Sequence, residues 1–206
     1  GTARRRILEG EQVPNGDKLF SLFEPDTELI KRGKVPQPIQ FGHPVLVIED
    51  AVGFICHYRI LPLGAQERDI LVPEMKQLQQ RVKGRIRRAS FDRGFHSPTN
   101  QKQLAEILTH PCLPMTGSKQ SARQEEQATV EFRQARRYHP GIESAIHALQ
   151  SGNGLARCRD HSSPGYARYI GLGIMGRNIW VLGKLLLARD YPQCVAANTQ
   201  RHKQVA

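Results

Sequence analysis

The stretch "IRRASFDRGFHSPTN", residues 86–100, decides the fold of this chain because it joins a strand to a helix. Residues 89–91 are typical of the last part of a strand, and Gly94 is predicted to permit the backbone turn that follows. Ser97 is a good N-cap and Pro98 is suited to the first helical position, so a new helix is expected to start there.

Asp92 lies between that strand and that helix. Open α/β sheets build their sites at the carboxyl ends of strands, so the position favours a functional carboxylate. The alternative is that Asp92 only forms its own turn, as an aspartate followed by glycine two residues later often does.

Further elements extend the pattern on both sides. Two β-rich runs, residues 43–50 and 53–63, are predicted to form a hairpin about the turn at residues 51–53. Asp69 is expected to cap a helix, a second helix to run from residue 98 to 109, and "CLPMTG" to be a short strand. The order of strands and helices predicts an α/β fold with a mixed sheet flanked by helices.

A later helix is predicted to begin at Pro140 and to end at the glycines of residues 152–154. It places Glu143 in its first turn, where an acid also simply favours the helix dipole. The apolar run at residues 169–187 approaches the length of a membrane span, but Arg177, Asn178 and Lys184 interrupt it. We expect a buried helix packed against the sheet, with Trp180 in the core and no membrane insertion.

The chain of 206 residues carries a formal net charge of +11, which points to a polyanion as partner. Its arginines and lysines come in clusters, and each cluster could also be an ordinary solvated surface. The clusters are Arg4, Arg5 and Arg6; Arg81, Lys83, Arg85, Arg87 and Arg88; Arg133, Arg136 and Arg137; and Arg157, Arg159 and Arg168.

The four cysteines lie far apart without a paired motif, which fits a reducing cytoplasm better than a disulfide framework. Cys158 and His161 could begin a zinc site, but no second ligand pair is apparent. Asp92 and Glu143 are instead suited to Mg²⁺ or Mn²⁺, because two-metal phosphodiester chemistry needs several carboxylates that converge from distant points of the chain.

Several segments together resemble the carboxyl-terminal part of a bacterial insertion-sequence transposase of the DDE type, which has an RNase H-like fold. The similarity covers most of residues 18–187, and the order and spacing of the segments make it specific. The segments are "SLFEPDTELIKRGK", "FGHPVLVIED", "GFI", "FDRGFHSPTN", "RRYHPGIESAIHALQSGNGLARCR" and "YARYIGLGIMGRNIWVLGKLL".

The resemblance implies an enzyme that cuts DNA at transposon ends and transfers the freed 3′-hydroxyl to target DNA. Asp92 matches the second family acid and Glu143 the third, and both would hold the metal. Arg136 and His139 would be partial substitutes for the family residues that contact the transposon end, while Arg87, Arg88, Arg93 and Arg137 are the further arginines expected to bind DNA.

Two departures accompany this resemblance. The family's first aspartate lies on an upstream strand with no match here, and none of Glu24, Asp26 or Asp50 can be assigned to its role. Many members of the family also have a tyrosine, an arginine and a lysine at fixed offsets around the third acid, whereas Arg136, His139 and Gln150 stand at those offsets here.

We therefore expect a partial DDE catalytic domain over residues 18–189 that lacks its first strand, with a helix and linker before it (1–17) and a tail after it (190–206). The whole protein is expected to act on DNA in the bacterial cytoplasm as a homo-oligomer. The alternatives are a remnant that binds DNA or forms multimers without chemistry, and a Mg²⁺-dependent nuclease of the same fold.

Overall fold

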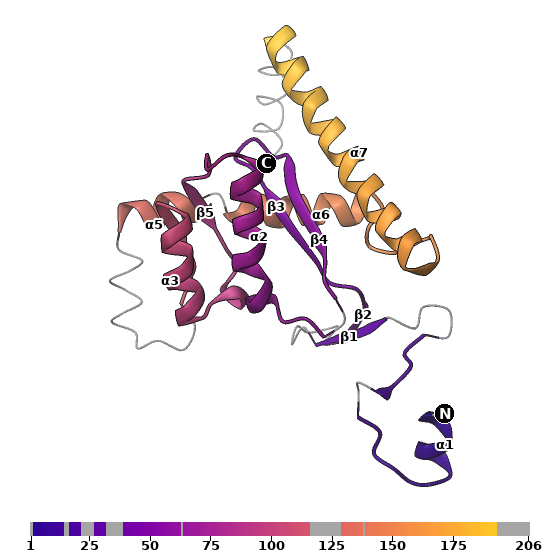
Figure 1. The fold of residues 1–206 in the computed structure, drawn as a ribbon. Helices are drawn as coiled ribbons and strands as arrows, with labels where there is room; N and C mark the ends of the chain where they lie inside the picture. The colour runs from indigo at the N-terminus through magenta and orange to yellow at the C-terminus, as the bar shows by residue number, and fades with distance from the viewer. Residues whose placement is uncertain are drawn as a thin grey trace, which may run out of the picture. The chain divides into compact units, whose positions relative to one another are not determined.

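The computed structural model describes residues 2–14, 17–21, 27–31, 39–62, 64–115, 129–137 and 139–192. Figure 1 shows its helices and strands. They divide into two compact units. Unit 1 comprises Gly1–Leu46, Tyr58–Pro140 and His161–Ser163, and unit 2 comprises Val47–His57, Gly141–Asp160 and Pro164–Ala206.

The described residues are mixed α/β, which confirms the predicted class. Their strands form three two-stranded sheets, and the RNase H-like arrangement remains a prediction. The elements in chain order are α1 (Thr2–Ile7), β1 (Glu28–Lys31), β2 (Ile39–Gly42), β3 (Val45–Glu49), β4 (Ile55–Ile60), α2 (Glu67–Arg81), β5 (Arg88–Ser90), the short 3₁₀ helix η2 (Arg93–Phe95), α3 (Pro98–Ile107), β6 (His110–Cys112), α5 (Val130–Arg136), α6 (His139–Ser151) and α7 (Ser162–Asp190).

The centre of unit 1 is a strand, helix, strand motif formed by β5, α3 and β6. The two strands are parallel, with Ala89 opposite Pro111, as expected when a helix connects them. Phe91 N donates to Cys112 O over 2.9 Å and so continues the ladder beyond the end of β5. The stretch that decides the fold therefore forms the predicted strand, turn and helix.

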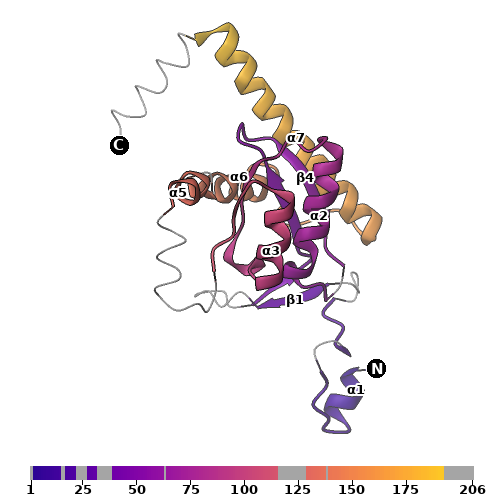
Figure 2. The ribbon, with the colours of Figure 1, turned by 60° about the vertical axis from the view of Figure 1, so that its left-hand side comes forward.

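Helices α2 and α3 lie side by side in unit 1 (Figures 1 and 2). Their apolar residues recur at helical spacing, and Leu71, Met75, Leu78 and Leu104 are almost completely buried. Because a buried leucine contributes about 1.5–3 kcal/mol, this row accounts for much of the unit's core.

Three boundaries in unit 1 differ from the prediction. Helix α2 has Gln66 as its N-cap and begins at Glu67, so Asp69 lies in the first turn and is not the cap. Helix α3 ends at Ile107, and β6 begins at His110, before the expected "CLPMTG" strand. The strand propensity of single residues does not determine where β6 starts, because backbone pairing with β5 selects the residues that become β6. The ends of helices are likewise set only to within one or two residues by local sequence.

The predicted hairpin of β3 and β4 is confirmed. Asp50 forms its turn, because Asp50 Oδ1 accepts hydrogen bonds from Val52 N and Phe54 N, each 2.9 Å long. Gly53 has a positive φ of 99°, which explains the glycine at this position. A turn-forming role thus accounts for Asp50, one of the acids that the sequence left unassigned. Glu24 and Asp26 lie outside the described residues.

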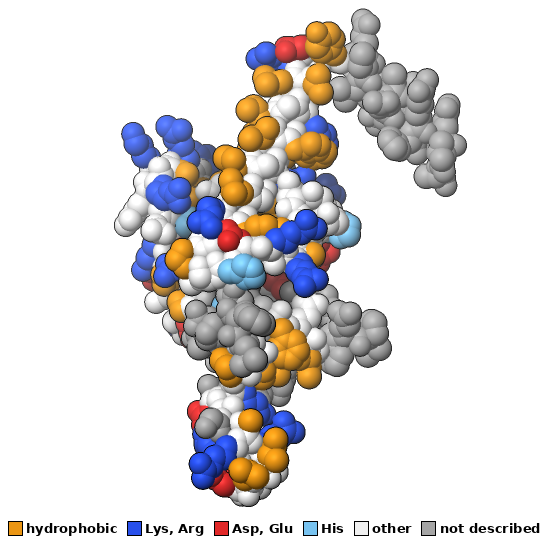
Figure 3. Space-filling model, turned by 90° about the vertical axis from the view of Figure 1, so that its right-hand side faces the viewer, with side chains coloured by type: hydrophobic (Ala, Val, Ile, Leu, Met, Phe, Trp, Pro, Cys, Tyr) orange, Lys and Arg blue, Asp and Glu red, His pale blue; other side chains and the backbone are white. Residues whose placement is uncertain are grey.

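Helix α7 has 29 residues, belongs to unit 2 from Pro164 onward, and is longer than the predicted run. The expectation of a buried helix was wrong, because many large apolar side chains of α7 are exposed in the part of the chain that the structure describes (Figure 3). Ile170, Ile174 and Val181 are buried, whereas Trp180 is 54% exposed and is not a core residue. Among the described residues, α7 is also long and apolar enough to cross a membrane by length and composition.

Candidate nucleic-acid interface

Asp92 occupies the position that the sequence predicted, directly after β5 and the buried Phe91. It is exposed and is the N-cap of η2, since Asp92 Oδ1 accepts a 2.6 Å hydrogen bond from Arg93 N. Gly94 lies within η2 and is not among the glycines with positive φ, so the expected conformational need for glycine is absent here. One carboxylate oxygen therefore supports the turn, and the carboxylate as a whole faces solvent.

Asn100 fixes the loop that carries Asp92. Its side chain is buried, and Asn100 Nδ2 donates to Phe95 O over 2.9 Å and to Arg68 O over 2.6 Å. The first bond holds the end of η2, and the second attaches α3 to the start of α2. Ser97 caps α3 as predicted, with Ser97 Oγ 3.0 Å from Asn100 N. The loop between β5 and α3 is thus held by buried polar contacts.

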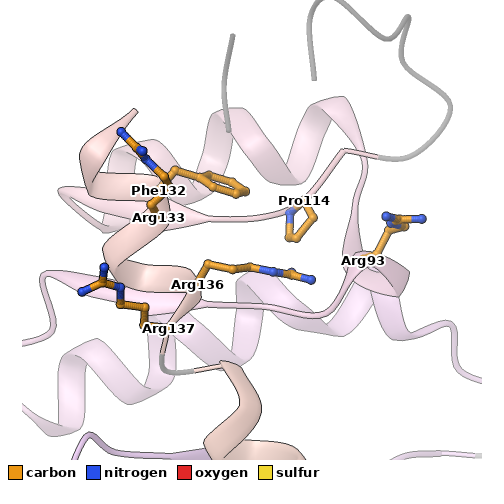
Figure 4. Close-up of a pocket in the computed structure, with 6 residues that line it drawn as sticks. All are labelled: Arg93, Pro114, Phe132, Arg133, Arg136 and Arg137. Carbon is orange, nitrogen blue, oxygen red and sulfur yellow. The ribbon is translucent and has the colours of Figure 1, made fainter. Parts of the chain in front are cut away.

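Arginines from three parts of unit 1 surround one hollow of about 580 Å³ (Figure 4). Arg93 comes from η2, Arg133 and Arg136 come from α5, and Arg137 follows α5. Pro114 and the largely buried Phe132 complete the lining. In Figure 4 the side chain of Arg136 extends from α5 toward Pro114, and Arg93 lies on the far side of Pro114.

Helix α5 is held against β6, which brings its arginines to the hollow. Thr129 caps the helix, with Thr129 Oγ1 accepting from Phe132 N. Phe132 and Ala135 form a buried cluster with Cys112 of β6. The arginines alternate with these apolar residues at helical spacing, so one face of α5 packs and the other presents positive charge.

The four arginines of the hollow have no ion pair with a carboxylate of the described residues. Four cationic side chains line this one hollow and make its surface positive, which attracts an anion. Guanidinium groups match the oxygens of a phosphate or carboxylate with paired hydrogen bonds. The arrangement is therefore suited to a phosphate-bearing ligand.

The other residues predicted to bind DNA do not line this hollow. Arg87 and Arg88 are exposed before and within β5, and Arg88 Nη1 donates weakly to Gln134 Oε1 over 3.3 Å. His139 is half-buried at the start of α6, and its Nδ1 is buried without a hydrogen-bond partner in the described part of the chain.

Glu143 belongs to unit 2, on α6, and is exposed. The helix begins at His139, so Glu143 lies in its second turn and not in the predicted first turn. Ala145 and Leu149 are buried, whereas Ile146 is exposed. Because Asp92 lies in unit 1, the two predicted acids belong to different units.

A further acid of unit 2, Glu49, is largely buried at the end of β3. Glu49 Oε1 lies 3.6 Å from Arg177 Nη2, and a Cβ placed on Gly141 would lie 3.5 Å from Glu49 Oε2. Burial raises the pKa of the Glu49 carboxyl above its usual range, while the charge of Arg177 acts in the opposite direction. This pair connects the hairpin to α7, and it lies close to the start of the helix that carries Glu143.

The residues that the structure describes do not on their own form a complete site for Mg²⁺. No three His, Cys, Asp or Glu side chains among them come together as a metal-binding group. A hard cation takes about six oxygen ligands, and Asp92 and Glu143 supply one carboxylate each. A metal held by these two acids would therefore need further ligands.

Two residues of these sites, Asn100 and Glu49, were not predicted to have a role. Arg133 was predicted only as a member of the basic cluster with Arg136 and Arg137. Asn100 and Glu49 had no detectable signal, because the role of a buried amide or carboxylate becomes visible only once its distant partners are known.

A comparison with protein-family models, curated proteins and solved structures found no match to this chain. The resemblance to DDE transposases therefore stays a prediction.

Proposed function

We propose that this chain binds DNA through the arginine hollow of unit 1, as part of the catalytic domain of a DDE transposase. The observation that carries the proposal is that Arg93, Arg136 and Arg137, each predicted to bind DNA, line one hollow together with Arg133. Arg93 directly follows Asp92, so the hollow borders the loop of the predicted catalytic acid.

The hollow supports DNA as the partner for an electrostatic reason. Arginine contacts to phosphates release counterions and provide affinity that does not depend on base sequence. The net charge of +11 adds long-range attraction for a polyanion. Such contacts position a DNA strand next to the loop that ends β5.

Asp92 and Glu143 are proposed to hold Mg²⁺ or Mn²⁺ with further ligands, within an RNase H-like arrangement of the whole catalytic domain. When bound, such ions activate water or a 3′-hydroxyl toward a phosphodiester. Within the chain, the hydrogen bonds of Asn100 would keep the Asp92 loop in place beside the arginines. A cytoplasmic location and oligomeric assembly belong to the same proposal.

The second candidate function is DNA binding without chemistry. It is favoured by the fact that the arginine hollow lies entirely within unit 1 and needs no metal to attract phosphate. The two candidates predict the same binding and differ only in strand cleavage.

Plasmid nicking in the presence of Mg²⁺ or Mn²⁺ separates the two. The intact chain is compared with Asp92→Asn and Glu143→Gln, which keep the size of each side chain and remove its charge. Glu106→Gln, an exposed change on α3, is the matched control, and DNA binding is measured in the same samples.

Activity that is lost in both acid variants and kept in Glu106→Gln would support the transposase proposal. Salt-sensitive binding without nicking in all samples would support the second candidate. Nicking that survives Asp92→Asn would rule out the proposed role of Asp92.

A further inference from the structure

Glu49, at the end of β3, directs its two carboxyl oxygens toward two different helices of unit 2. Its side chain is 10% exposed, and Glu49 Oε1 lies 3.6 Å from Nη2 of Arg177 on α7, whose side chain is 13% exposed. Glu49 Oε2 lies 3.5 Å from the point that a Cβ added to Gly141 would occupy. This buried carboxyl group therefore lies between α7 and the first turn of α6.

The α7 side of this arrangement is held by neighbouring contacts. Asn178 Nδ2 donates to Ile55 O over 3.0 Å, and Asn178 Oδ1 accepts from Ile55 N over 2.8 Å, so α7 is connected to β4. Arg177 also lies over the ring of Trp180, 5.1 Å from its centroid. Because β3 and β4 pair in one sheet, the hairpin and α7 together support the position of Glu49.

The pair of Glu49 and Arg177 is sensitive to loss of the carboxyl group. Arg177 Nε is already buried without a hydrogen-bond partner in the described part of the chain. Removing one member of a buried ion pair leaves the other uncompensated, which is strongly destabilising. Truncation of Glu49 is therefore expected to displace Arg177 and to loosen the contact with the start of α6.

Glu49 and Glu143 lie on opposite sides of α6. At about 100° per residue, Ala145 returns to nearly the same side of the helix as Gly141, whereas Glu143 lies about 200° away from Gly141. Ala145 is completely buried and Glu143 is exposed, in agreement with these positions. The two carboxyl groups therefore do not converge on one ion, and a role for Glu49 must act through the position of α6.

We propose that Glu49 is a positioning residue for Glu143. It holds the first turn of α6 against α7 and the hairpin, and Glu143 follows Gly141 by only two residues. Contacts that orient a metal ligand from outside the metal site typically change metal affinity by about 10–100-fold. This inference rests on the proposed function, in which Glu143 holds Mg²⁺ or Mn²⁺.

The test is the affinity of the full chain for Mn²⁺, measured without DNA from the electron paramagnetic resonance signal of the free ion. Glu49→Ala removes the carboxyl group, and Glu49→Gln keeps its size and one of its oxygens. Ile170→Ala is the matched control, because it truncates a buried residue of α7 and leaves the Glu49 carboxyl in place. Circular dichroism establishes that every variant is folded.

We expect the Mn²⁺ dissociation constant to rise about tenfold in Glu49→Ala and about threefold in Glu49→Gln. Ile170→Ala should stay within about twofold of the unmodified chain, because a destabilised protein that remains folded keeps its ligands in place. Hydrogen exchange of the amides at residues 143–147 gives a second readout that needs no metal. Exchange there should be faster in Glu49→Ala than in Ile170→Ala.

An Mn²⁺ affinity of Glu49→Ala equal to that of Ile170→Ala, or exchange in α6 no faster than in this control, would overturn the inference. Glu143→Gln in the same series tests the proposed function separately. If Glu143→Gln weakens Mn²⁺ binding and Glu49→Ala does not, only the positioning role is contradicted. Mn²⁺ binding that is absent, or unchanged in Glu143→Gln, would contradict the proposed function and this inference together.

Discussion

Asn100 shows how one buried side chain determines where a functional loop lies. Its amide nitrogen bonds two backbone oxygens, Phe95 O and Arg68 O, that belong to different elements of unit 1. A buried carbonyl left without a donor costs about 1–3 kcal/mol. The loop that carries Asp92 therefore depends on a residue that no charge or motif singles out.

We predict that Asn100→Ala lowers the free energy of unfolding by about 2 kcal/mol, because two partly buried hydrogen bonds to backbone oxygens are lost. Urea denaturation measures the change. Lys102→Ala, an exposed substitution on the same helix, is the control and should stay within about 0.5 kcal/mol. Equal stability of the two variants would contradict the role given to Asn100.

At the scale of elements, the ion pair of Glu49 and Arg177 connects β3 with α7. Burial is the largest influence on Glu49 and raises its pKa, so the folded chain holds this proton more tightly than the unfolded chain does. The resulting contribution to stability is complete below the unfolded value, near 4.5, and is lost as the pH rises through the folded value.

Glu49→Gln is therefore expected to remove part of the pH dependence of unfolding. The stability of the unmodified chain should fall relative to Glu49→Gln as the pH rises from about 4 upward. Thermal unfolding over a pH series measures this difference, and Glu106→Gln controls for the amide substitution. A difference that is flat, or that grows in favour of the unmodified chain, would be inconsistent with a buried carboxylate.

Local signals were sufficient to predict most elements. The Ser97 cap with Pro98, the Asp50 turn region and the helical spacing of Leu71, Met75 and Leu78 each depend on neighbours in sequence. The start of β6 could not be predicted in the same way, because it depends on pairing with β5. The exposure of the apolar side chains of α7 could not be predicted either, because it depends on how much of the helix surface other segments of unit 2 cover.

The candidate site was predictable in part for the same reason. Asp92 follows its strand as the local pattern indicated, and the cluster from Arg133 to Arg137 was visible as charge. That Arg93 joins this cluster across the hollow follows only from the packing of α5 on β6. Sequence spacing gives no information about such a contact.

At the scale of the whole molecule, two surfaces with different chemistry belong to different units. The arginine hollow belongs to unit 1, and the exposed apolar side chains of α7 belong to unit 2. The hollow is cationic and suited to phosphate, whereas the exposed side chains of α7 are largely apolar.

The salt dependence of DNA binding by the intact chain and by the double variant Arg133→Gln/Arg136→Gln tests whether the arginine hollow holds DNA. Arg168→Gln, which removes an exposed arginine paired with Asp160, is the matched control. Each lost phosphate contact should reduce the slope of log affinity against log salt by about 0.9, so we predict a slope smaller by about 1.8 in the double variant and unchanged in the control. An identical slope in all three proteins would show that the arginine hollow does not bind DNA.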